Sequence, residues 1–128
     1  MSKILIDTNI YSNALRGDEI VSFNLKKAEM IGISTISIGE LLSGFKGGEK
    51  ENRNRNELEQ FLDSPRVELY SVDFDTADFY AQILDALRTN GTPIPTNDIW
   101  IAATAFQNGL KLYTKDSHFN KIPGINLL

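Results

Sequence analysis

The sequence predicts an α/β protein, a three-layer α/β/α sandwich whose central sheet is mostly parallel. Short apolar runs alternate along the chain with longer segments that have the periodicity of amphipathic helices. The apolar runs are continuous rather than interrupted by polar residues, which indicates strands buried on both faces, as in a parallel sheet. The 128 residues suit a single domain, residues 1–128, without an internal repeat or low-complexity tract.

The first strand and helix meet at an acidic residue. The run Lys3-Ile-Leu-Ile-Asp7 predicts a buried strand that ends in a carboxylate. Thr8 or Asn9 is expected to cap a helix that begins near Ile10 and ends at Gly17.

The next segments repeat this order of helix and strand. A second helix is expected over residues 18–28, and the apolar residues 30–34 predict the second strand. A third helix is expected to start at Ser37 and to carry Glu40 in its first turn. Glycines and charges at residues 46–50 then break the pattern.

The remaining half of the chain follows the same alternation. A polar stretch at residues 52–56 leads into an amphipathic helix with Leu58 inward, and residues 67–72 predict the third strand. The other expected elements, in order, are a helix capped by Asp73 or Asp75 and ended by Gly91, a non-helical linker at 92–95, a helix over 96–108, and strands at 110–114 and 125–128. The helix over 96–108 is apolar on nearly every face and carries one charge in its first turns, Asp98.

Composition narrows the classes of function. The chain has no cysteine, which excludes disulfides and thiolate metal sites, and its single histidine excludes a site built from several histidines. The apolar run at residues 4–6 is too short for a signal peptide or a membrane span, so we expect a cytoplasmic protein. The net charge of −4 argues against general attraction to nucleic acid, although clustered acids that bind metal would hide part of that charge.

Four acidic residues are expected at the same edge of the sheet. Ligands of open parallel sheets bind beyond the carboxyl ends of the strands. Asp7 ends the first strand and Asp116 follows the fourth, while Glu40 and Asp98 lie in the first turns of helices. These positions predict that the four carboxylates converge.

Each acid also has a simpler explanation. Ser37-x-x-Glu40 has the spacing of a capping box, and Asp98 in a first turn suits the helix dipole. Asp7 and Asp116 have the positions of turn or cap residues. None of these explanations accounts for all four acids falling at the same end of their elements.

Clustered carboxylates need a counter-ion. Two of them about 4 Å apart repel by about 4 kcal/mol at an effective dielectric near 20. A set of oxygen ligands without Cys or His selects hard cations, so we expect Mg²⁺ or Mn²⁺. Such an ion lowers the pKa of a water and neutralises phosphate charge, which favours hydrolysis of a phosphodiester.

Four motifs carry a resemblance to a known family over the whole chain. They are Ile-Leu-Ile-Asp7-Thr-Asn9, Ser37-Ile-Gly-Glu40-Leu-Leu, Asn97-Asp98-Ile-Trp-Ile-Ala-Ala and Leu-Tyr-Thr114-Lys-Asp116-Ser-His-Phe119. Together they resemble the PIN domain, specifically the VapC-type toxins of bacterial toxin–antitoxin pairs. The resemblance implies a Mg²⁺- or Mn²⁺-dependent endoribonuclease. Its catalytic and metal-binding acids would be Asp7, Glu40, Asp98 and Asp116, with Asp7 and Asp98 as the expected direct ligands.

The resemblance also implies supporting residues and partners. Thr8, Asn9 and Thr114 would orient the carboxylates or waters. The implied partners are a cognate antitoxin whose arginine reaches the acids, a second copy of the chain in a homodimer, and an RNA substrate, whether tRNA, rRNA or mRNA.

Basic residues after the Glu40 helix are candidate RNA contacts, because Lys and Arg grip phosphates. They are Lys46, Lys50, Arg53 and Arg55. The alternative is a solvated helix start in which Glu49, Glu51 and Glu57 offset the charge. His118 and Phe119 are expected to pack the loop behind Asp116 rather than to take part in catalysis.

Three other functions share parts of this pattern. A receiver-type signalling domain needs an acid pair after the first strand and a phosphoacceptor Asp after the third, whereas Asp7 stands alone and Asp73 is a plausible cap. A haloacid-type phosphatase needs Asp-x-Asp after the first strand, where this chain has Asp7 and Asn9. A catalytically silent PIN domain that only binds a partner remains open.

Overall fold

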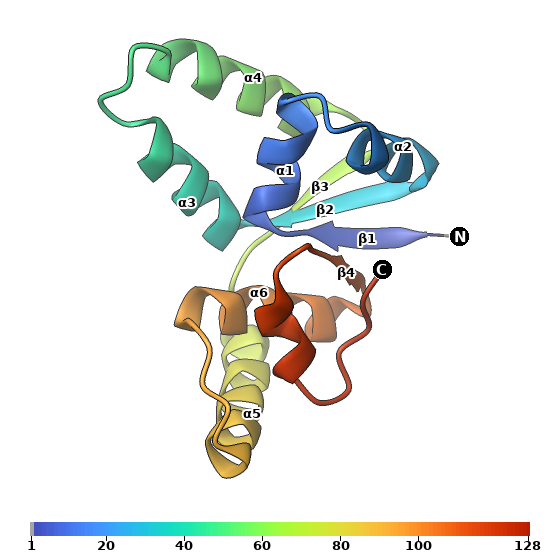
Figure 1. Cartoon of the computed structure of the whole chain (residues 1–128), viewed down its shortest axis with the longest axis vertical. Coiled ribbons are helices and arrows are strands. Elements are labelled where there is room, and N and C mark those ends of the chain that lie inside the picture. The colour runs from blue at the N-terminus through green and yellow to red at the C-terminus, as the bar shows by residue number, and fades with distance from the viewer. Residues whose placement is uncertain (1) are drawn as a thin grey trace.

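The central sheet of this protein is parallel throughout. A computed structural model describes residues 2–128 and contains four strands in the order β3-β2-β1-β4 (Figure 1). The strands are β1 (Lys3–Ile6), β2 (Met30–Ser34), β3 (Val67–Tyr70) and β4 (Lys111–Tyr113). Neighbouring strands all pair in parallel, which confirms the predicted sheet.

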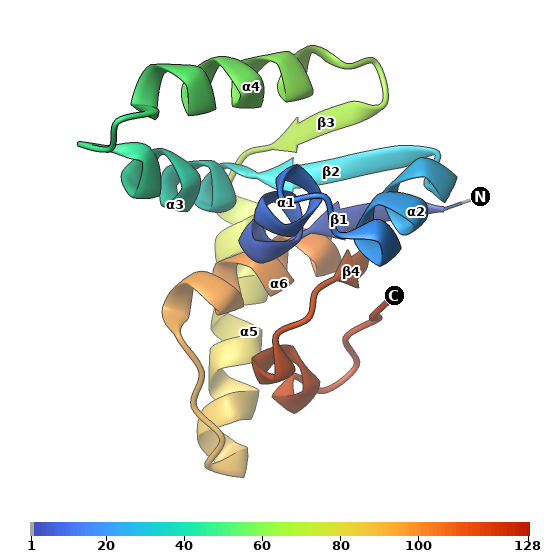
Figure 2. The same ribbon diagram turned by 45° about the horizontal axis from the view of Figure 1, so that its top comes forward.

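Helices cover both faces of the sheet. They are α1 (Thr8–Leu15), α2 (Glu19–Lys27), α3 (Thr35–Phe45), α4 (Glu51–Asp63), α5 (Phe74–Asn90), α6 (Thr96–Asn108) and the 3₁₀ helix η1 (Ser117–Lys121). Figures 1 and 2 show α1, α2 and α4 on one side of the sheet and α5 with α6 on the other. The expected three-layer sandwich is therefore confirmed. Among residues 2–128, no helix combines the length and the apolar character that crossing a bilayer requires.

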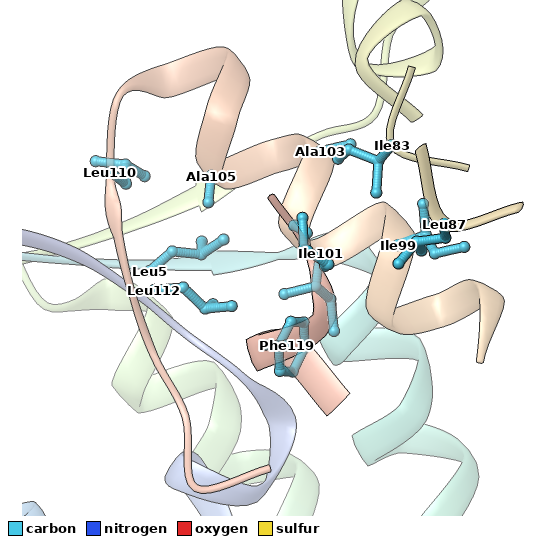
Figure 3. Close-up of a cluster of buried hydrophobic side chains, with 12 residues drawn as sticks. Leu5, Ile83, Leu87, Ile99, Ile101, Ala103, Ala105, Leu110, Leu112 and Phe119 are labelled. Carbon is cyan, nitrogen blue, oxygen red and sulfur yellow. The ribbon is translucent and has the colours of Figure 1, made fainter. Parts of the chain in front are cut away.

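Strand β1 separates two hydrophobic cores. Ile4 and Ile6 point into the core under α1, α2 and α4, whereas Leu5 points into the core under α5 and α6. Figure 3 shows this second core, where Leu5 and Leu112 of the sheet meet Phe119 of η1 and side chains of the two helices. Because successive strand side chains point to opposite faces, burial on both faces requires the unbroken apolar run seen in the sequence.

A glycine in β2 makes room for a ring from the edge strand. Gly32 pairs with Leu5 in β1 and with Glu68 in β3. A Cβ atom at Gly32 would lie 2.6 Å from Cε2 of Tyr70, well inside van der Waals contact. Gly32 therefore allows Tyr70 to pack against the core under α5 and α6.

The predicted last strand is wrong. Residues 125–128 form one isolated parallel bridge, between Leu112 and Leu127, rather than a strand. The Leu112 amide donates to the Asn126 carbonyl at 2.8 Å, and the Leu128 amide donates to the Leu112 carbonyl at 3.0 Å. A turn at Gly124, where φ is +76°, precedes this bridge.

Helices α3 and α4, like α1, begin earlier than predicted. Helix α3 begins at Thr35 because the Ser34 side chain caps it, accepting a hydrogen bond from the Ser37 amide at 3.2 Å. Ser37 therefore lies inside the helix, and the capping-box explanation of Glu40 is wrong. Helix α4 begins at Glu51, so the polar stretch 52–56 is itself helical.

Candidate metal centre

Asp7 links the end of β1 to the start of α1. It is the N-cap of α1, with Oδ1 accepting from the Ile10 amide at 3.0 Å, so the expected capping by Thr8 or Asn9 is wrong. Its other oxygen, Oδ2, accepts from the Thr114 hydroxyl. The residue is 4% exposed, so this carboxylate is held at the inner wall of the site.

Thr114 joins Asp7 to the loop that carries Asp116. Its Oγ1 donates to Asp7 and accepts from the Asp116 amide at 2.9 Å. Strands β1 and β4 are parallel neighbours with Ile6 opposite Tyr113, so the residues that follow both strands emerge side by side. Asp116 then caps η1, since its Oδ1 accepts from the His118 amide at 2.9 Å.

Asp98 reaches Asp116 from helix α6. It lies in the first turn of α6, whose apolar face fixes it at the edge of the core. His118 stands between the two acids: its Nδ1 is 3.1 Å from Oδ2 of Asp98 and 3.2 Å from Oδ1 of Asp116. Phe119 packs in the core as expected, but the contact of His118 with two acids was missed in the sequence interpretation. Its position two residues after Asp116 was the available signal.

Glu40 reaches the same place from α3. It is exposed, and its Oε1 accepts from the Thr8 hydroxyl at 2.6 Å. Its Oε2 accepts from Asn97 Nδ2 at 3.4 Å. The carboxylate is thus held between α1 and α6, and Asn97 was not among the expected supporting residues.

The four acids line one open cleft of about 380 Å³. Its lining comprises Asp7, Thr8, Asn9, Glu40, Pro95, Thr96, Asn97, Asp98, Ile101, Asp116 and His118. Within the cleft, ligand atoms of Asp98, Asp116 and His118 all lie within 4.8 Å of one another. Asp7 and Glu40 lie in the cleft outside that tighter group, so the expected direct pair of Asp7 with Asp98 stays a prediction.

Burial and neighbouring acids raise the pKa values of Asp7 and Asp98. Burial raises the pKa of Asp7, and the charges of Asp116 and Asp98 raise it further, against the hydrogen bonds from Thr114 and Ile10. Burial also raises the pKa of Asp98, to which the charges of Asp116 and Glu40 add, while the hydrogen bond from His118 opposes the shift. Negative charge at this place is therefore unfavourable until a cation balances it.

Of the residues expected to orient the acids, two make the contacts. Thr8 binds Glu40 and Thr114 binds Asp7, whereas Asn9 lines the cleft without a hydrogen bond to any acid among residues 2–128.

The candidate RNA contacts are mostly paired with acids on their own segment. Lys46 lies 3.2 Å from Glu51, Arg53 lies 3.0 Å from Glu57, and Arg55 lies 3.1 Å from Glu59. All three ion pairs are at the surface, where they contribute little to stability. The arrangement favours the solvated-helix interpretation, and RNA contact by these residues and by exposed Lys50 stays a prediction.

Comparison with known proteins decides the family. The family model of the PIN domain matches residues 4–125. This chain belongs to the PIN domain family. The PIN domain is similar to Toxin FitB of Neisseria gonorrhoeae, with 34% identity over 89% of this chain and 88% of the relative.

A second relative and a solved structure match nearly the whole PIN domain. Ribonuclease VapC2 of Haemophilus influenzae is 34% identical over 91% of this chain and 88% of its own. Among solved structures, the DNA-bound VapBC from Salmonella typhimurium superposes with a TM-score of 0.84 and 32% identity. That match covers 100% of this chain and 98% of the other.

The donor set of this PIN domain fits a divalent cation. Carboxylate oxygens suit hard ions such as Mg²⁺ and Mn²⁺. Burial first, and the neighbouring acids in addition, raise the pKa values of Asp7 and Asp98, so the charged carboxylates would be stabilised by a cation beside them.

Proposed function

We propose that this PIN domain, residues 1–128, is a Mg²⁺- or Mn²⁺-dependent endoribonuclease that hydrolyses RNA phosphodiester bonds with an activated water. We further propose that it acts as the toxin of a toxin–antitoxin pair. The observation that carries the proposal is the convergence of Asp7, Glu40, Asp98 and Asp116 in one open cleft. The similarity to a ribonuclease and to a toxin supports the same conclusion.

The roles of the residues follow from their contacts. Asp98 and Asp116 would hold the ion directly, because ligand atoms of the two residues lie within 4.8 Å of each other. When bound, a divalent ion acts as a Lewis acid that neutralises phosphate charge and lowers the pKa of water. Asp7, fixed by Ile10 and Thr114, presents a rigid carboxylate at the base of the cleft. Glu40 is the exposed member, so it is best placed to meet the substrate or an incoming water.

The support of these acids limits their movement. Thr114 uses one hydroxyl to position both Asp7 and the backbone of Asp116. Thr8 and Asn97 hold the two oxygens of Glu40 from different helices. Fixed ligands lower the cost of reorganisation when charge develops on the phosphate.

The proposed partners are a cognate antitoxin, an RNA substrate and a second copy of the chain. The solved relative is a VapBC assembly bound to DNA. On this chain, an apolar cleft of about 360 Å³ between α1, α2 and α4 suits the apolar face of a helix from an antitoxin. An antitoxin arginine could also pair with the acids of the metal centre.

The direct test is cleavage of RNA by the purified protein. We expect cleavage with Mn²⁺ or Mg²⁺ and none with EDTA. Asp98→Asn should abolish cleavage while leaving the circular dichroism spectrum unchanged. Asp85→Asn, on the exposed face of α5, is the matched control and should retain activity. Metal-independent cleavage, or full activity of Asp98→Asn, would refute the proposal; metal binding without cleavage of any RNA would favour the silent binding module.

The receiver alternative is disfavoured by the residue that would accept the phosphate. Asp73 follows β3, but its Oδ1 accepts from the Thr76 amide at 3.1 Å and from Gln107 Nε2 at 2.9 Å. It is therefore occupied as the cap of α5, and it is absent from the lining of the acidic cleft. Treatment with acetyl phosphate should leave the protein unmodified.

A further inference from the structure

His118 lies where a third ligand to the ion would lie. Its Nδ1 faces two carboxylates at nearly equal distances, 3.1 Å to Asp98 and 3.2 Å to Asp116. We propose that Nδ1 of His118 binds the ion together with Asp98 and Asp116, and that this nitrogen makes the site prefer Mn²⁺ to Mg²⁺. This inference rests on the proposed metal-dependent function and adds a ligand to its acidic set.

The distances from Nδ1 to the two carboxylates match edges of a coordination octahedron. Two neighbouring ligands at right angles, each about 2.1 Å from an ion, lie about 3.0 Å apart. The distances from Nδ1 to the two carboxylate oxygens are close to that value, and all three atoms lie within 4.8 Å of one another. Small shifts would therefore bring them around a common ion.

A hydrogen bond alone satisfies this arrangement poorly. Nδ1 carries at most one hydrogen, so it can donate well to only one of its two carboxylate neighbours. A cation between the three atoms would satisfy both acids and the nitrogen lone pair together. The hydrogen of neutral imidazole would then sit on Nε2, on a side chain that is 42% exposed.

The backbone holds His118 in place for this role. Its amide donates to Oδ1 of Asp116 at 2.9 Å, which fixes the first turn of η1. The next residue, Phe119, is 1% exposed and anchors that turn in the core. The imidazole therefore projects into the cleft from a fixed base, beside an acid whose own orientation is set by the same turn.

A nitrogen ligand changes which ion the site selects. Mn²⁺ begins the series of first-row transition ions that bind mixed nitrogen and oxygen sites, whereas Mg²⁺ takes oxygen ligands and loses its water reluctantly. A site made of acids alone would discriminate little between the two ions on ligand type. With His118 included, Mn²⁺ gains more from the nitrogen ligand than Mg²⁺ does.

Pulsed electron paramagnetic resonance tests the bond directly. His118 is the single histidine of the chain, so tag-free protein loaded with Mn²⁺ can show imidazole ¹⁴N coupling only from this residue. We expect that coupling in the wild type and its loss in His118→Leu. A bound Mn²⁺ without ¹⁴N coupling in the wild type would overturn the inference, and this result needs no variant to fold.

Calorimetric titration without RNA tests the preference. We expect His118→Leu to weaken Mn²⁺ binding by at least about tenfold and Mg²⁺ binding much less. Asn120→Leu, on the exposed side of η1, is the matched control and should bind both ions as the wild type does. Equal loss for both ions, or unchanged Mn²⁺ binding, would overturn the inference.

The two proposals fail in different ways. If the protein binds Mn²⁺ tightly without ¹⁴N coupling and cleaves RNA with metal, the proposed His118 bond is refuted and the nuclease proposal stands. If the protein shows the ¹⁴N coupling and the preference for Mn²⁺ but cleaves no RNA, the His118 bond is supported and the nuclease proposal is refuted. Absence of binding of either ion removes both.

Discussion

Replacing Asp98 by Asn should stabilise the metal-free protein while destroying its response to metal. In the cleft, oxygens of Asp98 and Asp116 lie within 4.8 Å of each other, with side chains that are 17% and 28% exposed. Burial and these neighbouring charges raise the pKa of Asp98, so its charged form is unfavourable in the fold. Asparagine keeps the size and a hydrogen-bond acceptor but removes the charge.

The size of the effect follows from these distances. Two unit charges 4.8 Å apart repel by about 3.5 kcal/mol at an effective dielectric near 20, and partial exposure reduces this. The weaker hydrogen bond from His118 to a neutral amide offsets part of the gain. We expect a net stabilisation of about 1–2 kcal/mol. For 128 residues, whose unfolding entropy is about 0.27 kcal/mol/K, this raises Tm by about 4–7 °C.

Thermal unfolding in EDTA and in Mn²⁺ measures both halves of the prediction. Mn²⁺ at about 100 times its Kd should stabilise the wild type by about 2.7 kcal/mol, or about 10 °C, and Asp98→Asn much less. The order of stability of the two proteins should therefore reverse between the two buffers. A variant that is less stable than the wild type in EDTA, or that gains as much from Mn²⁺, would refute the electrostatic reasoning. Asp85→Asn should show neither change.

Four further predictions follow from the same structure. Because burial raises the pKa of Asp7, its contribution to the stability of metal-free protein is greatest below about pH 4 and falls as pH rises through the raised value. In urea unfolding with EDTA, the free energy of unfolding of Asp7→Asn should therefore rise relative to that of the wild type from pH 4 to 8. A difference that does not change with pH would contradict this. Thr114→Val should cost about 1–2 kcal/mol in urea unfolding and lower cleavage, because Oδ2 of Asp7 and the Asp116 amide each lose the hydrogen bond to Thr114, while Thr114→Ser should restore both. Gly32→Ala should cost about 1–3 kcal/mol in the same assay by displacing Tyr70, and the Gly39→Ala control, where a Cβ meets nothing within 4 Å, should not. We expect the proposed homodimer to bury Phe74, which is 86% exposed, so Phe74→Glu should sediment as a monomer; a wild type that is monomeric at all concentrations would contradict it.

The sequence was most informative where one physical constraint decides the structure. The run from Ile4 to Ile6 must be apolar throughout because β1 feeds two cores, and this alone predicts a central parallel strand. Gly91 and Gly109 end α5 and α6 in the left-handed region, as their positions predicted. The edge where the acids gather then follows from the direction of the strands.

Sequence reasoning failed where two residues compete for one role. Ser34 and Ser37 both have the right chemistry to cap α3, and only the fold shows that Ser34 does so and leaves Glu40 free to meet Thr8. Asp7 likewise serves as a cap and as a wall of the cleft, two roles that the sequence interpretation treated as alternatives. The contacts of Asn97 depend on the approach of α3 to α6, which no local pattern encodes.

The hydrogen bond between Thr114 and Asp7 spans 107 positions of the chain, and that between Asn97 and Glu40 spans 57. An ion bound to Asp98 and Asp116 would be coupled through these hydrogen bonds to Asp7 and Glu40, and so to helices in both outer layers of the sandwich. Closing loops of this length costs chain entropy that only the complete fold repays. Metal binding should therefore slow amide hydrogen exchange across the whole sheet, in strands far from the cleft as well as beside it. A chain that is locally unfolded should not bind the ion.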